Sequence, residues 1–278
     1  MSKASKKVLV TGGNKGIGKA ICQALLEKYP DVHVILGSRD ISRGEAASKD
    51  ICAAVPGSES RLDVMEIDVS SDASVESAGS SMEGQLYGIV NNAGIGFGNT
   101  FKETVNTNYF GMRRVNKAFS KYLQRPGGRI VNIASASGPM FVNGLQSGDL
   151  KDKLSYPKSN FADEKEIDTI AESFYDQLDY GNDAYGLSKA LVNAYTAIHA
   201  ERETDFIINS CTPGFIDTDI TRGMGASNPP SKGAVCPVHL LMSDEIGQQP
   251  TGWFYGSDAV RSPLHCYRDP GSPAYDGP

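Results

Sequence analysis

The stretch KKVLVTGGNKGIG, residues 6–18, decides the fold. Its first half is a short apolar run that ends in glycines, as expected for a strand buried in a parallel sheet. Its second half opens a segment, residues 15–29, in which Ile17, Ile21 and Leu25 recur at the spacing of an amphipathic helix. A strand, a glycine-rich turn and a helix in this order are typical of the unit that binds a dinucleotide.

The glycine-rich turn indicates a pyrophosphate site. Glycine lets the backbone approach the phosphates closely, and the N-terminus of the following helix offers free N–H groups and the positive end of the helix dipole. The glycines are spaced G-x-x-x-G-x-G instead of the commoner G-x-G-x-x-G. The residues that we expect to contact the cofactor at this turn are Gly12, Asn14, Lys15, Gly16, Ile17 and Gly18.

Strands and helices alternate along the rest of the chain. Further strands are predicted at residues 31–40, 61–70, 86–94, 129–135, 206–214 and 251–257, and further helices at residues 41–55, 71–82, 100–125 and 183–202. The sequence offers a capped start for the helix at 71–82, at Ser71 or Asp72. This order predicts an α/β fold: a single Rossmann-type, doubly wound parallel sheet of about seven strands with helices on both faces.

We expect one domain over residues 1–278, because no internal repeat and no linker divides the chain. Two stretches break the alternation. One is a long polar insertion at about residues 141–181, and the other is an irregular tail, rich in Pro and Gly, at about residues 256–278.

Composition and charge argue against several classes of protein. A net charge of −6 disfavours a general nucleic-acid binder. No apolar run approaches the length of a membrane span, and the basic N-terminus precedes an apolar run too short for a signal peptide. The five cysteines are scattered without metal-ligand spacing. We therefore expect reduced thiols, no metal, no membrane or nucleic-acid partner, and a cytoplasmic location.

The end of the second strand predicts which dinucleotide binds. An NAD site places a carboxylate there to bind the ribose hydroxyls. In the register that we prefer, Ser38 takes this position and is followed by Arg39, with Arg43 one helical turn on. Together with Lys15 in the glycine turn, these arginines could surround a 2′-phosphate, which favours NADP(H). A register shift of two residues would place Asp40 at the carboxylate position and restore an NAD site.

A candidate catalytic pair lies on the helix at 183–202. Tyr185 and Lys189 are four residues apart, so they share a face of a helix. A nearby ammonium lowers the pKa of a phenol, and a tyrosine tuned in this way can pass a proton near neutral pH. Chance also supplies such pairs, so the pair alone is a weak signal.

Six motifs strengthen it, because they occur in a fixed order: TGGNKGIG, NNAG, NTNYFG, NIASASG, YGLSK and CTPG. Together they resemble the short-chain dehydrogenase/reductase family over residues 7–253. The glycine turn, the SRD after the second strand and the insertion are most similar to its carbonyl reductase branch. The members of this branch are mostly monomeric, and the resemblance implies an NADPH-dependent enzyme that reduces ketones, aldehydes or quinones.

The resemblance also implies roles for individual residues. Ser135, with Ser137 as the fallback, would hydrogen-bond the substrate oxygen. Tyr185 would donate the proton, and Lys189 would lower the pKa of Tyr185. Asn108 would hold a water that links Lys189 to solvent. The further cofactor contacts that the resemblance implies are Asp68, Val69, Asn91, Ala93, Gly94, Tyr185, Lys189, Pro213, Gly214, Ile216 and Thr218.

Two alternatives to a general carbonyl reductase stay open. One is a reductase specific for an alkaloid, terpenoid or steroid ketone, since the sequence does not fix the substrate. The other is an NADP-binding redox sensor without turnover, which intact Ser135, Tyr185 and Lys189 disfavour. A sugar-nucleotide epimerase would need a larger C-terminal domain. Some carbonyl reductases carry Cys-Cys before the Pro-Gly, where this chain has Cys211 and Thr212, which disfavours glutathione adducts as substrates.

The insertion predicts a monomer. Because of the insertion, 49 residues separate Ser135 from Tyr185, which is far more than in many relatives. Phe161, Ile167, Ile170 and Phe174 give a predicted helix near residues 163–178 one apolar face. We expect this helix to cover the surface through which other members of the family pair, although a lid over the active site is the alternative. We expect the insertion, the segment after Thr218 and the aromatic residues 253–255 to line the substrate pocket.

Overall fold

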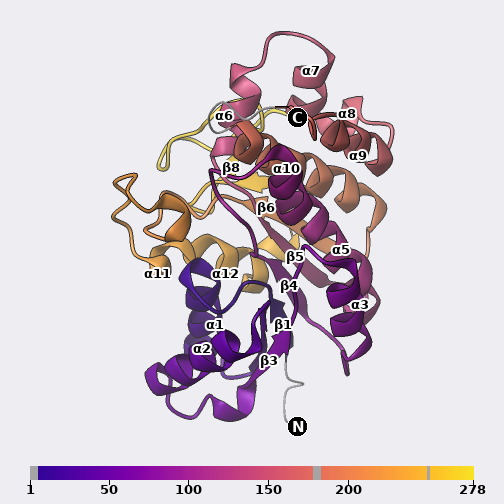
Figure 1. Ribbon diagram of the computed structural model, residues 1–278. Coiled ribbons are helices and arrows are strands. Elements are labelled where there is room, and N and C mark those ends of the chain that lie inside the picture. The colour runs from indigo at the N-terminus through magenta and orange to yellow at the C-terminus, as the bar shows by residue number, and fades with distance from the viewer. Residues whose placement is uncertain (1–5, 178–182, 249–250) are drawn as a thin grey trace.

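The computed structural model describes residues 6–177, 183–248 and 251–278. Its strands form one sheet in the order β3-β2-β1-β4-β5-β6-β7-β8 (Figure 1). The strands are β1 (Lys6–Val10), β2 (Val32–Ser38), β3 (Leu62–Glu66), β4 (Gly88–Asn91), β5 (Gly128–Ile133), β6 (Phe206–Cys211), β7 (Phe254–Tyr255) and β8 (Arg261–Ser262). Strands β1 to β7 are parallel, and β8 adds an antiparallel edge in the tail. The predicted doubly wound sheet is confirmed.

Both faces of the sheet are covered, because apolar side chains point both ways along each strand. On β1, Val8 and Val10 belong to one buried cluster and Leu9 to another. The first cluster packs against α1 (Gly16–Lys28), α2 (Ile41–Ala54) and α12 (Val235–Met242). The opposite face carries α3 (Asp72–Ser80), α5 (Gly111–Phe119) and α10 (Asp183–Arg202). The strand order reverses between β1 and β4, which is where doubly wound sheets bind ligands.

Side-chain caps decide where several helices begin. Ser71 caps α3 by accepting a hydrogen bond from the Ser74 amide, so the first of the two predicted starts is confirmed. Thr100 and Glu103 form a capping box before α4 (Phe101–Val105). The helix predicted at 100–125 continues from α4 through a π-helical turn (Asn106–Phe110) into α5, and it ends in a 3₁₀ turn at Ser120–Tyr122.

The insertion is more helical than predicted. It holds α6 (Ser137–Gly144), α7 (Asp149–Ser155), α8 (Pro157–Asn160) and α9 (Glu164–Ser173). Only the last was expected, and the end of that prediction, from residue 178 on, lies outside the described residues. After β6, the described residues also form α11 (Pro230–Gly233), and short 3₁₀ turns lie at Glu59–Arg61 and Ile246–Gln248.

Helix α9 packs on its own chain. Ile167 is fully buried against α10, as its predicted apolar face requires. Asp168 accepts a hydrogen bond from the Tyr109 hydroxyl at 2.8 Å and pairs with Arg113 of α5. A second carboxylate, Glu164, lies 3.0 Å from the same guanidinium. Figure 1 shows α9 beside α10 and close to α5. This packing supports the covering role, and the monomeric state stays a prediction.

Candidate active site

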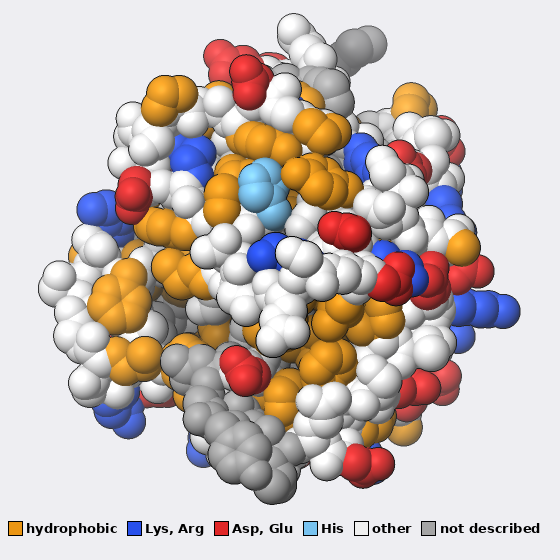
Figure 2. All heavy atoms as spheres, turned by 90° about the horizontal axis from the view of Figure 1, so that it is seen from above, with side chains coloured by type: hydrophobic (Ala, Val, Ile, Leu, Met, Phe, Trp, Pro, Cys, Tyr) orange, Lys and Arg blue, Asp and Glu red, His pale blue; other side chains and the backbone are white. Residues whose placement is uncertain are grey.

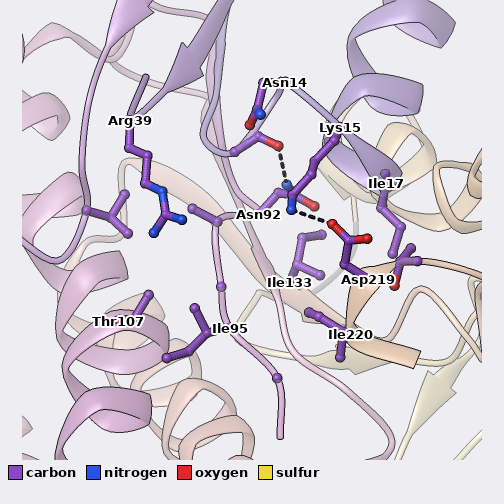
Figure 3. A pocket seen from close by; sticks show the side chains of 18 of the residues that line it. Asn14, Lys15, Ile17, Arg39, Asn92, Ile95, Thr107, Ile133, Asp219 and Ile220 are labelled. Atoms are coloured by element: carbon purple, nitrogen blue, oxygen red, sulfur yellow. Dashed lines mark hydrogen bonds and ion pairs between the residues drawn. The ribbon is translucent and has the colours of Figure 1, made fainter. Parts of the chain in front are cut away.

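A cavity of about 940 Å³ opens at the carboxyl ends of β1, β2, β4 and β5. The glycine turn, the loop after β4 and the segment 217–224 surround it (Figure 3). One end is lined by Ser38, Arg39 and Arg43, and the lining also includes Tyr185 and Lys189 of α10. The single cavity therefore joins the predicted cofactor residues to the predicted catalytic pair.

The glycine turn has the shape that a diphosphate needs. Gly12 and Gly16 have φ of +65° and +53°, which side chains rarely adopt. A Cβ on Gly18 would lie 2.2 Å from the Gly12 carbonyl oxygen, so only glycine fits there. Helix α1 begins after Lys15 without a side-chain cap, which leaves its first N–H groups open to an anion.

The end of β2 favours the preferred register. Ser38 is 1% exposed and donates to the Asp40 carbonyl at 2.8 Å. Asp40 caps α2 by accepting from the Arg43 amide at 3.0 Å, and its carboxylate also lies 3.5 Å from the Arg43 guanidinium. Arg39 has no carboxylate partner among the residues that the structure describes, and Figure 3 shows its side chain reaching into the cavity. The carboxylate is thus engaged and Arg39 is available.

Lys15 departs from the predicted cluster of three cations. Its ammonium lies 2.5 Å from the carboxylate of Asp219, away from Arg39 in Figure 3. Arg222 pairs with the same carboxylate. The hydrogen bond and the charge of Lys15, together with Arg222, lower the pKa of Asp219. Asp219 lies in a 3₁₀ turn, Asp219–Thr221, which is close to the glycine turn only in the folded chain. The ion pair therefore joins the segment after β6 to the glycine turn.

Helix α10 places the predicted catalytic pair inside the protein. Tyr185 and Lys189 are 9% and 5% exposed. The Lys189 ammonium donates to the Ile133 carbonyl at 2.9 Å and lies 5.6 Å from the centre of the Tyr185 ring. The Ser135 side chain interacts with the Tyr185 hydroxyl, and the Ser135 hydroxyl also donates to that of Ser137 at 3.3 Å. Ser135, the first choice, is thus the serine beside the tyrosine.

The pKa of Tyr185 is not lowered as the sequence predicted. Burial raises the pKa of Tyr185, and the hydrogen bond from Ser135 opposes that rise. Burial lowers the pKa of Lys189 to about 8. The predicted lowering of the tyrosine pKa by Lys189 is therefore not found in the protein alone, because desolvation dominates and the ammonium is directed at the Ile133 carbonyl. Tyr185 holds its proton at neutral pH.

Asn108 occupies the π-helical turn and holds the loop after β4. Its amide group donates to the Ile95 carbonyl and the Ser188 hydroxyl, both at 3.0 Å. Its side-chain oxygen accepts from the Ile95 amide at 2.8 Å. Both amide hydrogens are thus used within the protein. The predicted water at Asn108 stays a prediction, and the contact with Ile95 is a role that the sequence did not indicate.

Most of the remaining predicted contacts line the cavity. These are Asp68, Val69, Ala93, Gly94, Pro213 and Thr218. Gly214 and Ile216 do not line it. Asn91 does not line it either, because its amide group donates to Asn116 and Asn132, both at 2.8 Å, inside the protein. Its neighbour Asn92 lines the cavity instead and donates to the Thr11 carbonyl at 2.9 Å.

The mouth of the cavity was only partly predicted. The segment after Thr218 contributes Ile220 and Met224, as expected. No residue of 141–177 or 253–255 lines it, so that part of the prediction is wrong for the described residues. The loop after β4 contributes Ile95 and Phe97 instead, and the Phe97 ring lies 4.8 Å from that of Tyr185. The alternation of glycine and apolar residues in GIGF, residues 94–97, is the signal that could have shown this.

None of the helices in the described part of the chain is both long and apolar enough to cross a membrane. Within residues 6–177, 183–248 and 251–278, no group of three or more His, Cys, Asp or Glu side chains could hold a metal ion.

Known proteins are similar to this chain over most of its length. The family model for short chain dehydrogenases matches residues 6–147. Carbonyl reductase [NADPH] 1 of Homo sapiens is 31% identical over 285 residues, which cover 94% of this chain and 99% of that protein. (-)-Isopiperitenone reductase of Mentha piperita is 30% identical and covers 93% of this chain and 98% of its own.

Solved structures show the same architecture. Menthone neomenthol reductase from Mentha piperita superposes with a TM-score of 0.75 at 25% identity, covering 92% of this chain and 99% of its own. Salutaridine reductase from Papaver somniferum has a TM-score of 0.76 at 24% identity, covers 90% of this chain and 99% of its own, and supports the fold alone.

Proposed function

Because the chain belongs to the short-chain dehydrogenase family, we propose that it is an NADPH-dependent reductase that converts a ketone, aldehyde or quinone carbonyl into an alcohol. One observation carries this proposal: Tyr185 and Lys189 line the same cavity as Arg39, which has no carboxylate partner among the described residues, and Ser135 interacts with the Tyr185 hydroxyl beside that cavity. We further propose a single reductase domain over residues 1–278, since all strands of the described residues join one sheet.

The residues of the cavity fit NADPH. The uncapped start of α1 and the glycines before it would hold the pyrophosphate. Asp68 and Val69 would border the adenine. Arg39 and Arg43 would face the 2′-phosphate, where a guanidinium can form two parallel hydrogen bonds. Asp40 is held by α2, so it is a poor candidate for the ribose ligand of an NAD enzyme.

Lys15 would reach the same phosphate only by leaving Asp219. The pair is exposed, with 64% of the Lys15 side chain and 46% of the Asp219 side chain accessible, and exposed ion pairs contribute little to the free energy of folding. An entering phosphate could therefore displace the carboxylate from Lys15 at small cost. Tyr185 and Lys189 would contact the opposite end of the cofactor.

NADPH, when bound, supplies a hydride to the carbonyl carbon. Tyr185 then gives its hydroxyl proton to the carbonyl oxygen as the general acid. Its raised pKa suits this direction of reaction, because the phenol keeps its proton at neutral pH until charge develops on the substrate. Ser135 stabilises that charge through a second hydrogen bond to the same oxygen.

Lys189 has a distinct task. With a pKa of about 8, its side chain is mostly an ammonium at pH 7. The Ile133 carbonyl fixes this ammonium near the tyrosine ring. The positive charge stabilises the phenolate that forms when Tyr185 loses its proton, so it lowers the free-energy cost of the proton transfer.

We propose that the substrate is uncharged and carries apolar groups next to its carbonyl. Phe97 lies on the tyrosine ring, and Ile95, Ile220 and Met224 also line the cavity. A ketone on a terpenoid or another apolar skeleton is the second candidate, which the relative from Mentha piperita and this lining favour. A non-catalytic sensor has no use for the buried Tyr185 and Lys189.

The direct test is consumption of NADPH with a panel of carbonyl compounds. The panel contains an aromatic ketone, a monocyclic terpenoid ketone, a quinone and a ketone that carries a carboxylate. We expect turnover with the first three and little with the charged ketone, because apolar side chains surround the tyrosine. Binding of NADPH without turnover on any compound would instead support the sensor.

A further inference from the structure

A second cavity, of about 310 Å³, lies away from the proposed catalytic centre and shares none of its lining residues. It is formed by α8, the β7–β8 hairpin, the C-terminal tail and Ala197 of α10. Ala197 follows Tyr185 by twelve residues on the same helix, which corresponds to about 18 Å along the helix axis. Seen from above, apolar side chains gather around a histidine in the middle of the face on which α7, α8 and the C-terminus lie (Figure 2).

The central group of this cavity is the guanidinium of Arg261. It lies between two aromatic rings, with its carbon 4.2 Å from the centre of Trp253 and 5.2 Å from that of Tyr275. The rings hold it by cation–π contacts. Its hydrogen bond to the Tyr275 carbonyl is long, at 3.4 Å, and a guanidinium offers five donors.

Arg261 also lacks a carboxylate among the residues that the structure places. Most arginines of the chain are neutralised, as Arg113 is by Glu164 and Asp168. Among the described residues, Arg39 is the other arginine of these two cavities without such a partner, and we assign it to the cofactor phosphate. An unpaired guanidinium in a cavity wall is expected where an anion binds.

Two more groups complete the site. Lys158 of α8 uses its ammonium for one hydrogen bond of 3.3 Å to the Thr251 carbonyl, which leaves two donors. Ser155 is 8% exposed, and its hydroxyl has no partner within the described chain. No Asp or Glu side chain is among the described residues that line the cavity. Pro278, which carries the terminal carboxylate in this sequence, also lines it, but no ion pair joins it to Arg261 or Lys158 in the described structure.

We propose that this cavity binds a small aromatic carboxylate. Arg261 would hold the carboxylate in a fork, Lys158 would add a second positive charge, and the rings of Trp253 and Tyr275 would stack on the planar part of the ligand. The volume is at the lower end of the range for ligand pockets, about 300–1,000 Å³, so it suits a single-ring acid and excludes a dinucleotide. The site is independent of the proposed catalytic function.

The test uses a reporter that the chain already carries. Trp253 is the single tryptophan of the sequence, so its fluorescence reports this cavity alone. Titration of the full chain with benzoate is expected to change that fluorescence, with 1:1 stoichiometry by calorimetry and saturation below about 10 mM. Saturation with NADP⁺ should leave the affinity for benzoate unchanged.

Matched ligands and variants separate charge from shape. Benzamide lacks the charge and cyclohexanecarboxylate lacks the planar ring, and each should bind at least about tenfold more weakly than benzoate. Arg261→Gln should weaken benzoate by a similar factor, whereas Arg222→Gln, at the other cavity, should not change it. If Arg261→Gln does not fold, Lys158→Gln at an exposed position takes its place. Absence of saturation, equal binding of benzamide, or insensitivity to these substitutions would overturn the proposal.

Discussion

Arg39→Ala is expected to remove most of the preference for NADPH over NADH. The Arg39 side chain reaches into the cavity without a carboxylate partner among the described residues, while Asp40 and Arg43 are paired at the start of α2. A hydrogen bond to a charged group contributes about 1.5–3 kcal/mol. Since 1.4 kcal/mol corresponds to a factor of ten, loss of one such contact raises KM for NADPH by about 10-fold to 100-fold.

The assay is steady-state reduction of one ketone with each cofactor. KM for NADH should change less than about twofold in Arg39→Ala, because NADH has no 2′-phosphate. Arg222→Ala is the matched control, since Arg222 also lines the cavity but pairs with Asp219. Equal kcat/KM for NADPH and NADH in the wild type would refute the reasoning and return Asp40 to the ribose.

Three further predictions concern the same cavity and the assembly of the chain. The rate of ketone reduction should be constant below pH 7 and fall as the pH rises through about 8, because burial lowers the pKa of Lys189 and its ammonium is lost there; a pH–rate profile that stays flat to pH 10 contradicts this. Asp219→Asn should tighten NADPH binding severalfold because it frees Lys15, whereas Lys15→Ala should weaken that binding. Fluorescence titration measures both dissociation constants. Weaker binding in both variants would show that the ion pair instead helps NADPH to bind by holding the segment 217–224 over the cavity. Light scattering at micromolar concentration should give a mass near that of one chain, 29.7 kDa, because α9 covers α5 and α10; a dimeric or tetrameric mass would rule out the covering role.

The sequence was informative where local pattern determines structure. The apolar runs of β1 to β7 alternate with helical periodicity, so the order of the elements and the doubly wound sheet could be predicted. Strand β8 could not, because two residues in a tail rich in Pro and Gly carry no periodic signal. The helices α6, α7 and α8 are short, and tertiary contacts with α10 stabilise them more than their own sequence does.

In the candidate site, too, local spacing could be predicted and contacts between distant segments could not. That Tyr185 and Lys189 share a face of α10 was predictable from helical spacing, and the ordered motifs singled out this pair. Asn91 was misplaced because alternation along β4 turns its side chain toward Asn116 of α5, and the next residue, Asn92, faces the glycine turn. The partner of Lys15 is 204 positions away, at Asp219, so only the folded chain reveals it.

The proton donor is the centre of this account, and Tyr185→Phe tests it most directly. Loss of a general acid typically lowers the rate 10²-fold to 10⁴-fold. The substitution removes the hydroxyl that Ser135 contacts but keeps the ring that packs on Phe97, so the cavity should retain its shape. Measured side by side, kcat for ketone reduction should fall at least about a hundredfold while the NADPH dissociation constant changes less than about twofold. Retention of more than about a tenth of wild-type turnover would contradict the assignment of Tyr185 as the proton donor.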